Sequence, residues 1–294
     1  MFPDQDIKRH AQSRRLYQST YSMSALVTYE PYVDECAGIF TQRLTELADG
    51  GQPANMGHWF LCYAYDVIGT ITFSKRFGFL DRGEDVEGVI KALGDHLQYA
   101  SLTGIFPHLH KYLFPLKNYL SAGGKGAGRG YLLSFTKERM TEHRNSPKAI
   151  RSDEEDEKSG KAVDFLTKFV SRHSANPEQF TLAHTLAGCT SNIVAGADTT
   201  GISLCAILYH LLRHPETFRK LREEVDRHSR EKGPGYITFK DSQEMEYLQA
   251  VIKEALRMHP ATGLPLERVV PAGGATIAGH FFPQGVSRSI PDLP

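Results

Sequence analysis

Six consecutive residues, Ala195 to Thr200 (Ala-Gly-Ala-Asp-Thr-Thr), interrupt an apolar, proline-free stretch between Phe180 and His214. Glycine weakens a helix by about 1 kcal/mol relative to alanine, and Asp and Thr side chains compete for backbone hydrogen bonds. Gly196 would leave room for a small ligand, and Asp198 and Thr199 could then deliver protons to an oxygen species beside the helix. The same residues also fit a kinked, buried helix in which a threonine hydroxyl bonds to a backbone carbonyl.

Glu254 and Arg257 are a second pair whose residue types could have a chemical role. They lie three residues apart in a stretch that ends at Pro260. On a helix this spacing places both side chains on one face. Because most of their neighbours are apolar, we expect a bidentate and buried pair that helps to specify the fold. An exposed surface pair is the alternative, and it is the commoner arrangement for this spacing.

Basic residues at two places could bind an anionic group. His10 and Arg14 are spaced i, i+4 near the N-terminus, and Arg268 follows Glu267 before a β-like region. Paired cationic side chains of this kind can hold carboxylates or phosphates. The alternatives are a solvated basic helix face for the first pair and an ordinary surface arginine for Arg268.

These side chains must be positioned by helices, because most of the chain has apolar residues at helical spacing. The residues from 145 to 161 are strongly charged and form a predicted mobile linker, and the residues from 104 to 120 predict irregular turns with an apolar surface. From Thr262 onward, glycines, prolines and short β-branched or aromatic pairs predict a small β-sheet. The prediction is a mainly α protein with one long central helix and a small sheet near the C-terminus. The expected helices cover residues 6–21, 29–47, 56–73, 85–99, 130–143, 180–214, 215–231 and 242–259.

The composition and the cysteine spacing favour some classes of protein over others. The 34 basic and 34 acidic residues among 294 give no net charge, which gives no support for binding to nucleic acid. We expect no signal peptide or membrane anchor at the N-terminus, and we interpret residues 186–212 as a core helix.

The cysteines lie far apart without a Cys-x-x-Cys pair, so they are predicted to be free, buried thiols. They are Cys36, Cys62, Cys189 and Cys205.

Taken together, the motifs resemble those of the cytochrome P450 haem-thiolate monooxygenases, in particular the fungal, microsomal-type members. The resemblance rests on the order and spacing of several segments and covers roughly residues 4 to 285. These segments are His10-Ala-Gln-Ser-Arg-Arg15, Asp66-Val-Ile-Gly-Thr-Ile-Thr-Phe73, Ala195-Gly-Ala-Asp-Thr-Thr200, Glu254-Ala-Leu-Arg257-Met-His-Pro260, Leu264-Pro-Leu-Glu-Arg268 and the region from Gly279 to Gly285.

The resemblance implies a role for each matching residue. Thr199 would protonate iron-bound dioxygen with Asp198 as the proton relay, and Glu254 and Arg257 would hold the fold beneath the haem. Ala195 and Gly196 would form the oxygen groove, while His10, Arg14 and Arg268 would bind the haem propionates. The residues implied to border a small lipophilic substrate are Ala195, Thr200, Leu264, Pro265 and Leu266. The family also implies an NADPH-cytochrome reductase as partner, a monomer, and the endoplasmic reticulum membrane as the location of full-length members; without an anchor this chain would be cytoplasmic or of unknown location.

One departure from the family pattern has chemical consequences. The family's cysteine ligand to iron lies in a Phe-x-x-Gly-x-x-x-Cys-x-Gly loop well beyond the Glu-x-x-Arg helix, and the last cysteine here, Cys205, precedes that helix. We therefore expect a partial domain over residues 1–285, an aberrant tail over residues 286–294, no metal ligand, weak haem binding and no monooxygenase activity. The alternatives are a non-catalytic, ligand-binding remnant and a helical scaffold unrelated to haem.

Overall fold

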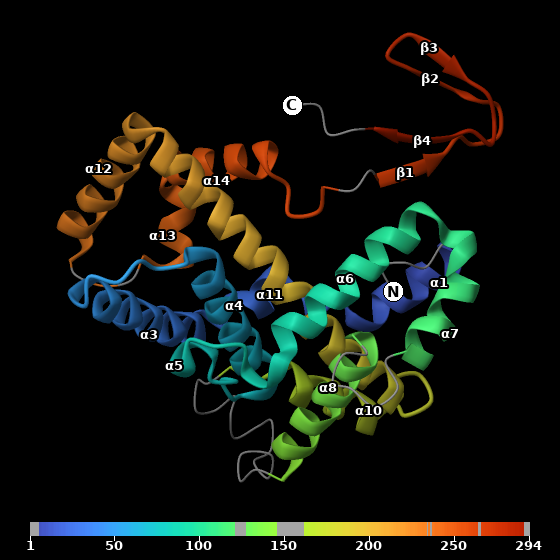
Figure 1. Cartoon of the computed structure of the whole chain (residues 1–294), viewed down its shortest axis with the longest axis horizontal. Coiled ribbons are helices and arrows are strands. Elements are labelled where there is room, and N and C mark those ends of the chain that lie inside the picture. Colours follow the sequence, from blue (N-terminus) through green and yellow to red (C-terminus); the bar gives the residue numbers. More distant parts are fainter. Residues whose placement is uncertain are drawn as a thin grey trace. The chain divides into compact units, whose positions relative to one another are not determined.

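A computed structural model describes residues 6–120, 128–145, 162–233, 235, 237–263 and 266–290 (Figure 1). The chain divides into two compact units. Unit 1 contains residues 1–202 and 236–239, and unit 2 contains residues 203–235 and 240–294. The predicted mainly α fold is confirmed, and the strands follow the helices near the C-terminus as expected.

Unit 1 is a set of helices around one aromatic core. Its largest fully buried side chains include Tyr65, Phe79, Phe135, Phe165 and Phe169. The elements are α1 (Ile7–Tyr17), α2 (Met23–Val27), α3 (Glu30–Asp49), α4 (Met56–Phe73), α5 (Phe79–Arg82), η1 (Val86–Gly88), α6 (Val89–Ile105), η2 (Pro107–Leu109), α7 (His110–Leu120), α8 (Gly128–Arg144), α10 (Phe165–Ala175) and the first two thirds of α11 (Leu182–Arg213).

The prediction of irregular turns between residues 104 and 120 was wrong. This segment forms the end of α6, the short η2 helix and the whole of α7. Pro115 lies inside α7, where its missing N–H removes one helical hydrogen bond without ending the helix. The apolar residues of the segment supply a helical period that outweighs the prolines.

The buried carboxylate of Asp66 fixes the turn after α4. Asp66 is fully buried and accepts hydrogen bonds from the backbone N–H groups of Gly78 (2.8 Å), Phe79 (3.2 Å) and Leu80 (2.9 Å). Arg76 lies 3.7 Å away and also pairs with Asp81. A buried carboxylate is tolerated because it is fully hydrogen-bonded, and it attaches the start of α5 to α4.

A second buried carboxylate, Asp164, joins three helices. It caps the N-terminus of α10 through the Thr167 N–H (2.7 Å), and it accepts a hydrogen bond from Ser74 (2.7 Å) at the end of α4. His143 near the end of α8 lies 2.9 Å from the same carboxylate. Burial opposes ionisation, but the bonds from His143, Thr167 and Ser74 together lower the pKa of Asp164.

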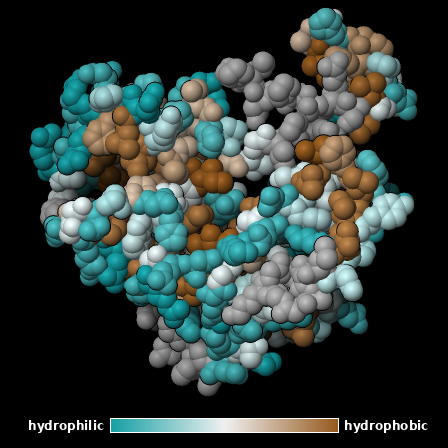
Figure 2. Space-filling view, in the orientation of Figure 1, coloured by the Kyte–Doolittle hydropathy of each residue, from teal (hydrophilic) through white to brown (hydrophobic). Residues whose placement is uncertain are grey.

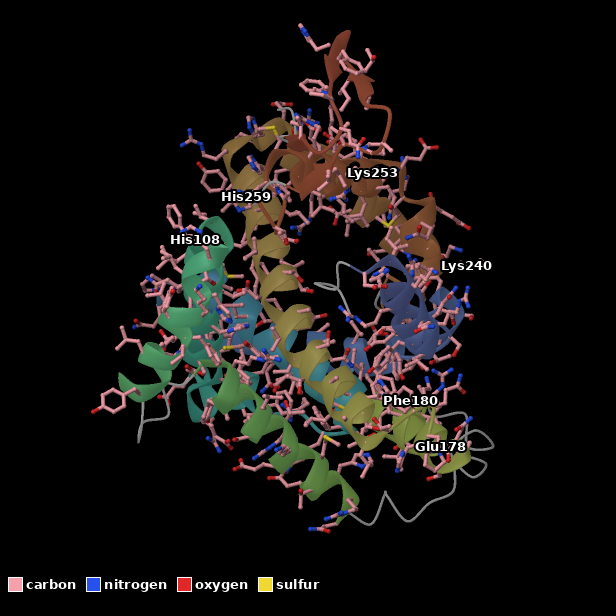
Figure 3. The ribbon with its side chains drawn as sticks, turned by 90° about the vertical axis from the view of Figure 1, so that its right-hand side faces the viewer. His108, Glu178, Phe180, Lys240, Lys253 and His259 are labelled. Atoms are coloured by element: carbon pink, nitrogen blue, oxygen red, sulfur yellow. The ribbon has the colours of Figure 1, made fainter. Side chains whose placement is uncertain are left out.

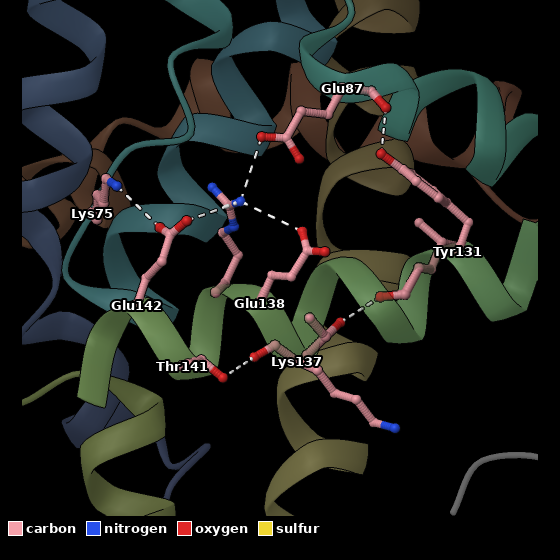
Figure 4. Close-up of polar contacts among 10 residues, drawn as sticks. Lys75, Glu87, Tyr131, Lys137, Glu138, Thr141 and Glu142 are labelled. Carbon is pink, nitrogen blue, oxygen red and sulfur yellow. Dashed lines mark hydrogen bonds and ion pairs between the residues drawn. The ribbon is translucent and has the colours of Figure 1, made fainter. Parts of the chain in front are cut away.

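Polar contacts also attach α8 to its surroundings (Figure 4). Arg139 lies 3.1 Å from Glu142 and 3.4 Å from Glu87, and Glu142 is 3.1 Å from Lys75. The hydroxyl of Tyr131 donates to the backbone carbonyl of Glu87. Helix α8 is thereby joined both to η1 and to the segment after α4.

Unit 2 begins within α11 and continues through three further helices and four short strands. Pro215 opens α12 (Pro215–Lys232), as predicted; α13 spans Phe239–Glu244 and α14 spans Glu246–Met258. Strand β1 (Leu266–Val269) pairs antiparallel with β4 (Ser287–Ile290), and β2 (Ala275–Ile277) pairs with β3 (His280–Phe282). The expected small sheet is therefore a pair of two-stranded ladders.

Candidate functional site

Helix α11 carries the Ala195–Thr200 segment without interruption from Leu182 to Arg213. By length and composition alone this helix could cross a membrane. Its Cys189, Ile193 and Ala197 are fully buried in the core of unit 1, and this packing is what we expect of a core helix. The predicted central helix is thus confirmed.

Helix packing explains why position 196 is a glycine. A Cβ atom at Gly196 would come within 2.4 Å of Ile68 Cδ1 on α4, and one at Gly201 would come within 2.9 Å of Leu61 Cδ2 on the same helix. The missing side chains let α4 and α11 approach closely. The room that we expected beside Gly196 for a small ligand is taken up by Ile68.

A neighbouring face of α11 is open. Ala187, Ser191 and Ala195 follow each other at intervals of four residues and are all exposed, and Thr199 continues this row half-buried. The Thr199 hydroxyl donates a hydrogen bond to the Ala195 carbonyl at 2.7 Å, as in the structural alternative stated above. Small side chains make this face of α11 flat and able to accept a planar group.

Asp198 is the acidic group of the segment. Its side chain is partly buried and forms no hydrogen bond or ion pair among the described residues, and burial raises its pKa. A carboxyl group in this state holds a proton more readily than one in water. This is the property required of a proton donor.

Tyr65 of α4, which the motifs of the sequence do not single out, also lies near this segment. Its hydroxyl is fully buried and has no hydrogen-bond partner among the described residues. Burial raises the pKa of Tyr65, and the charge of Asp198 raises it further. No pattern in the sequence indicates this relationship, because it depends on how α4 crosses α11.

The expectation of a buried Glu254–Arg257 pair was wrong. The two side chains do form a bidentate pair on α14, at 2.7 and 2.8 Å. However, Glu254 is 61% exposed and Arg257 is 46% exposed. They lie at the border of the strongly amphipathic α14, where the described residues leave both charged groups in contact with solvent, so the pair contributes little to stability.

Glu254 also lines a groove in unit 2. The groove has a volume of about 390 Å³ and lies between the end of α11, the start of α12 and α14. Apolar residues form most of its wall, with His210 and His214 beside Glu254. Its lining residues are Ile207, His210, Leu211, His214, Thr217, Tyr247, Ala250, Val251, Glu254, Ala255 and Met258.

The predicted anion-binding residues lie in both units. His10 and Arg14 share one face of α1; His10 is half-buried and Arg14 is exposed, and neither side chain forms a hydrogen bond or ion pair among the described residues. Arg268 is exposed on β1. Leu264 and Pro265 lie outside the described residues, and Leu266 begins β1.

Comparison with known proteins decides the family. A sequence model for the family described as Cytochrome P450 matches residues 1–291. The chain belongs to the cytochrome P450 family. A cytochrome P450 monooxygenase of Aspergillus terreus is 38% identical over 97% of the chain and 57% of its own length.

A pisatin demethylase of Fusarium vanettenii is 37% identical over 99% of the chain and 55% of its own length. The P450 monooxygenase cicH of Emericella nidulans is 34% identical over 97% of the chain and 56% of its own length. The chain thus spans a little more than half the length of these relatives. Family membership makes this a relative of haem-dependent oxidoreductases.

The haem of the P450 family requires a cysteine thiolate, so the described cysteines can be tested for this role. Cys36, Cys62 and Cys189 are fully buried in the core of unit 1. Burial raises the pKa of Cys36 to about 11 and that of Cys62 to about 12, and it raises the pKa of Cys189 as well. These thiols are protonated and unsuited to bind iron.

The remaining cysteine, Cys205, lies half-buried on α11. Among the described residues no group of three or more His, Cys, Asp or Glu side chains could hold a metal ion. A thiolate-ligated haem takes a single cysteine, and the three core thiols do not fit that role because they are fully buried. The open face at Ala195 and Thr199, by contrast, is compatible with a planar group.

Proposed function

We propose that this chain is the part of a P450 monooxygenase that forms the oxygen side of the haem pocket. The activity belongs to a longer protein, which hydroxylates or demethylates a small lipophilic substrate with dioxygen. Bound haem would supply the oxygen-activating iron in that protein. The observation that carries the proposal is the open face of α11 at Ala195 and Thr199, with Asp198, whose pKa is raised by burial, beside it.

We assign the following roles to this chain's own residues in the longer protein. Asp198 and Thr199 hold and pass protons, Ala195 forms the wall of the groove, and Gly196 lets α11 pack closely against α4. Glu254 and Arg257 hold the fold beneath the haem, and His10, Arg14 and Arg268 bind the propionates. Substrate is bordered by Thr200, Leu264, Pro265 and Leu266.

For the 294-residue polypeptide alone we propose weak haem binding and no monooxygenase activity, because its buried thiols do not provide a thiolate. The test is the absorbance spectrum of the haem-reconstituted, reduced and carbon monoxide-bound chain. We expect no thiolate-type band. A thiolate-type band would contradict the proposal, and its survival or loss in Cys205→Ser would show whether a core thiol or Cys205 ligates the iron.

A non-catalytic, ligand-binding remnant is the competing function, and the burial of Cys36, Cys62 and Cys189 in the core is the observation that favours it. Reading the transcript beyond the codon for Gly285 separates the two. An in-frame segment with a cysteine loop supports the oxygenase, and the protein it encodes is then tested by the same spectrum. Stop codons in every spliced form support the remnant.

The family suggests the remaining properties. We propose that the longer protein is a monomer that receives electrons from an NADPH-cytochrome reductase at the endoplasmic reticulum membrane. Purification of the longer protein from a membrane fraction tests its location, reductase-dependent substrate turnover tests the partner, and its size in light scattering tests the monomer. Turnover without any reductase would contradict the assigned partner.

A further inference from the structure

The hydroxyl group of Tyr65 lies inside the helical core of unit 1. The Tyr65 side chain is fully buried, and its hydroxyl has no hydrogen-bond partner among the described residues. Polar side chains of unit 1 lie mostly at its surface, and Figure 2 shows hydrophilic residues over α3 and α8. Buried polar groups are normally hydrogen-bonded, so an unpaired hydroxyl in the core requires an explanation.

The ring of Tyr65 is held in one position by stacking. It lies against the ring of Phe79, with 4.8 Å between the ring centroids and 18° between the ring planes. Phe79 is itself fully buried, and its backbone N–H donates to the Asp66 carboxylate. Packing between α4 and the start of α5 therefore fixes where the Tyr65 hydroxyl lies.

The contact between α4 and α11 brings Tyr65 to the level of Asp198. The two α11 glycines described above pack against Leu61 and Ile68 of α4. Tyr65 lies between Leu61 and Ile68 along α4, and Asp198 lies between the two glycines along α11. Helix α11 is continuous through this contact, and Figure 3 shows it running unbroken from its start near Phe180. Tyr65 and Asp198 therefore belong to the part of the two helices where the backbones approach closely.

Asp198 is the acidic group that acts on this hydroxyl from α11. Burial raises the pKa of Tyr65, the charge of Asp198 raises it further, and Asp85 adds a smaller effect. Asp85 is already occupied, because its carboxylate oxygens accept hydrogen bonds from the backbone N–H groups of Ile90 (2.9 Å) and Lys91 (3.0 Å). Asp198 forms no hydrogen bond or ion pair in the described part of the chain. An unused donor on α4 thus lies near an unused acceptor on α11.

We propose that Tyr65 is a positioning residue for Asp198, and that its hydroxyl donates a hydrogen bond to the Asp198 carboxylate when that group has lost its proton. This role rests on the proposed function, since Asp198 releases and regains a proton only in that setting. The proton that leaves Asp198 passes to the open face of α11 at Thr199, and Tyr65 keeps its own proton throughout. Tyr65 itself touches none of the reacting groups.

The hydrogen bond limits how far burial raises the pKa of Asp198. Burial favours the protonated carboxyl group, whereas a hydrogen bond to the carboxylate favours the ionised form. A group that exchanges protons efficiently needs a pKa near the working pH, so the two effects together suit the assigned role. Because burial of the Tyr65 hydroxyl itself costs free energy, the pKa of Asp198 is more informative than the stability of the chain.

The test is a pH titration by NMR of the 294-residue chain labelled with carbon-13 at the aspartate carboxyl carbons. Asp198→Asn identifies the Asp198 resonance by its loss. We expect Tyr65→Phe to raise the pKa of Asp198 by about one pH unit, because the ionised carboxylate loses its donor. An unchanged pKa of Asp198 in Tyr65→Phe would overturn the proposal.

Matched controls remove a hydroxyl group elsewhere on the same two helices. Thr185 on α11 is fully buried, and its hydroxyl also has no partner among the described residues. Tyr63 on α4 is half-buried, and burial raises its pKa to about 12. Thr185→Val and Tyr63→Phe should leave the pKa of Asp198 unchanged. If either variant raised it as much as Tyr65→Phe does, altered packing would be the cause and the proposal would be refuted.

A second titration needs no change at Tyr65. In a chain labelled with carbon-13 at the tyrosine Cζ atoms, we expect the Tyr65 resonance to move with the same pKa as Asp198, and this movement should disappear in Asp198→Asn. A Tyr65 resonance that stays constant over that pH range would overturn the proposal even if Tyr65→Phe failed to fold. So would a movement that persists in Asp198→Asn, which would make Asp85 the partner.

These titrations do not depend on monooxygenase activity, so the two proposals fail separately. An unchanged pKa of Asp198 in Tyr65→Phe, together with an active longer protein, would refute the role of Tyr65 alone. The expected rise in pKa, together with a longer protein that shows no turnover, would refute the proposed function and still establish the hydrogen bond between Tyr65 and Asp198.

Discussion

Gly196 on α11 lies directly against Ile68 on α4, since a Cβ atom at Gly196 would come within 2.4 Å of Ile68 Cδ1. Gly196→Ala should therefore destabilise the chain by about 1–3 kcal/mol, because overpacking outweighs the gain in helix propensity. Urea unfolding measures this loss. In an Ile68→Val background, which removes the Cδ1 atom, the loss should be smaller.

The matched control is Gly94→Ala on α6, where an added Cβ atom meets nothing within 4 Å. This change should stabilise the chain by up to about 1 kcal/mol through helix propensity alone. If Gly196→Ala stabilised the chain as much as Gly94→Ala does, the close contact between α4 and α11 would be refuted.

Removing the hydroxyl group from two buried tyrosines should change the stability of the chain differently. Tyr17 donates a hydrogen bond to the His184 carbonyl at 2.8 Å, so Tyr17→Phe should destabilise the chain by about 1–2 kcal/mol. The Tyr65 hydroxyl has no partner among the described residues, so Tyr65→Phe should be neutral or stabilising. A large loss of stability in Tyr65→Phe would reveal a partner for the hydroxyl, with Asp198 as the first candidate, and Asp198→Asn in the same background would test it.

The hydrogen bonds around the Asp164 carboxylate predict that the free energy of unfolding depends on pH in the acidic range. Its pKa is lowered in the folded chain by His143, Thr167 and Ser74 despite burial, so the folded state binds the proton of Asp164 less readily than the unfolded state does. The resulting stability is fully present above the unfolded pKa of about 3.9, and it is lost as the pH falls through the lower folded pKa. Unfolding free energies measured across this range should fall less steeply in Asp164→Asn than in the original chain.

An exposed carboxylate on α12 is the control for this measurement. Asp226→Asn removes the carboxylate of an exposed ion pair with Arg222 on the same helix. It should leave the change of unfolding free energy with pH unaltered. An identical slope in Asp164→Asn and the original chain would mean that Asp164 does not contribute to the acid dependence.

The Glu254–Arg257 pair should behave as an ordinary surface pair in this chain. We expect the double-mutant cycle of Glu254→Gln and Arg257→Gln to give a coupling energy no larger than that of the exposed Glu216–Arg219 pair on α12. Both cycles are measured by urea unfolding at low and moderate salt. A coupling that exceeds the reference pair several-fold and persists in salt would show that the pair is shielded from water.

The sequence by itself determined the local elements and the family. The apolar spacing on α11 and α14, and Pro215 at the start of α12, predicted helices that the structure contains. The ordered motifs from His10 to Gly285 pointed to the P450 family, and the comparisons confirmed it. The helices depend on interactions between residues close together in the chain, so a local pattern records them, and the family was indicated by the order of the motifs along the chain.

Tertiary structure alone decided how those side chains are used. It exposed the Glu254–Arg257 pair that we expected to be buried, filled the space beside Gly196 with Ile68, and left the Tyr65 hydroxyl without a partner. It also formed α7 where irregular turns were predicted, and left its apolar side chains exposed. Burial depends on which faces of distant segments meet, and periodicity along one segment carries no information about the partner on the other side.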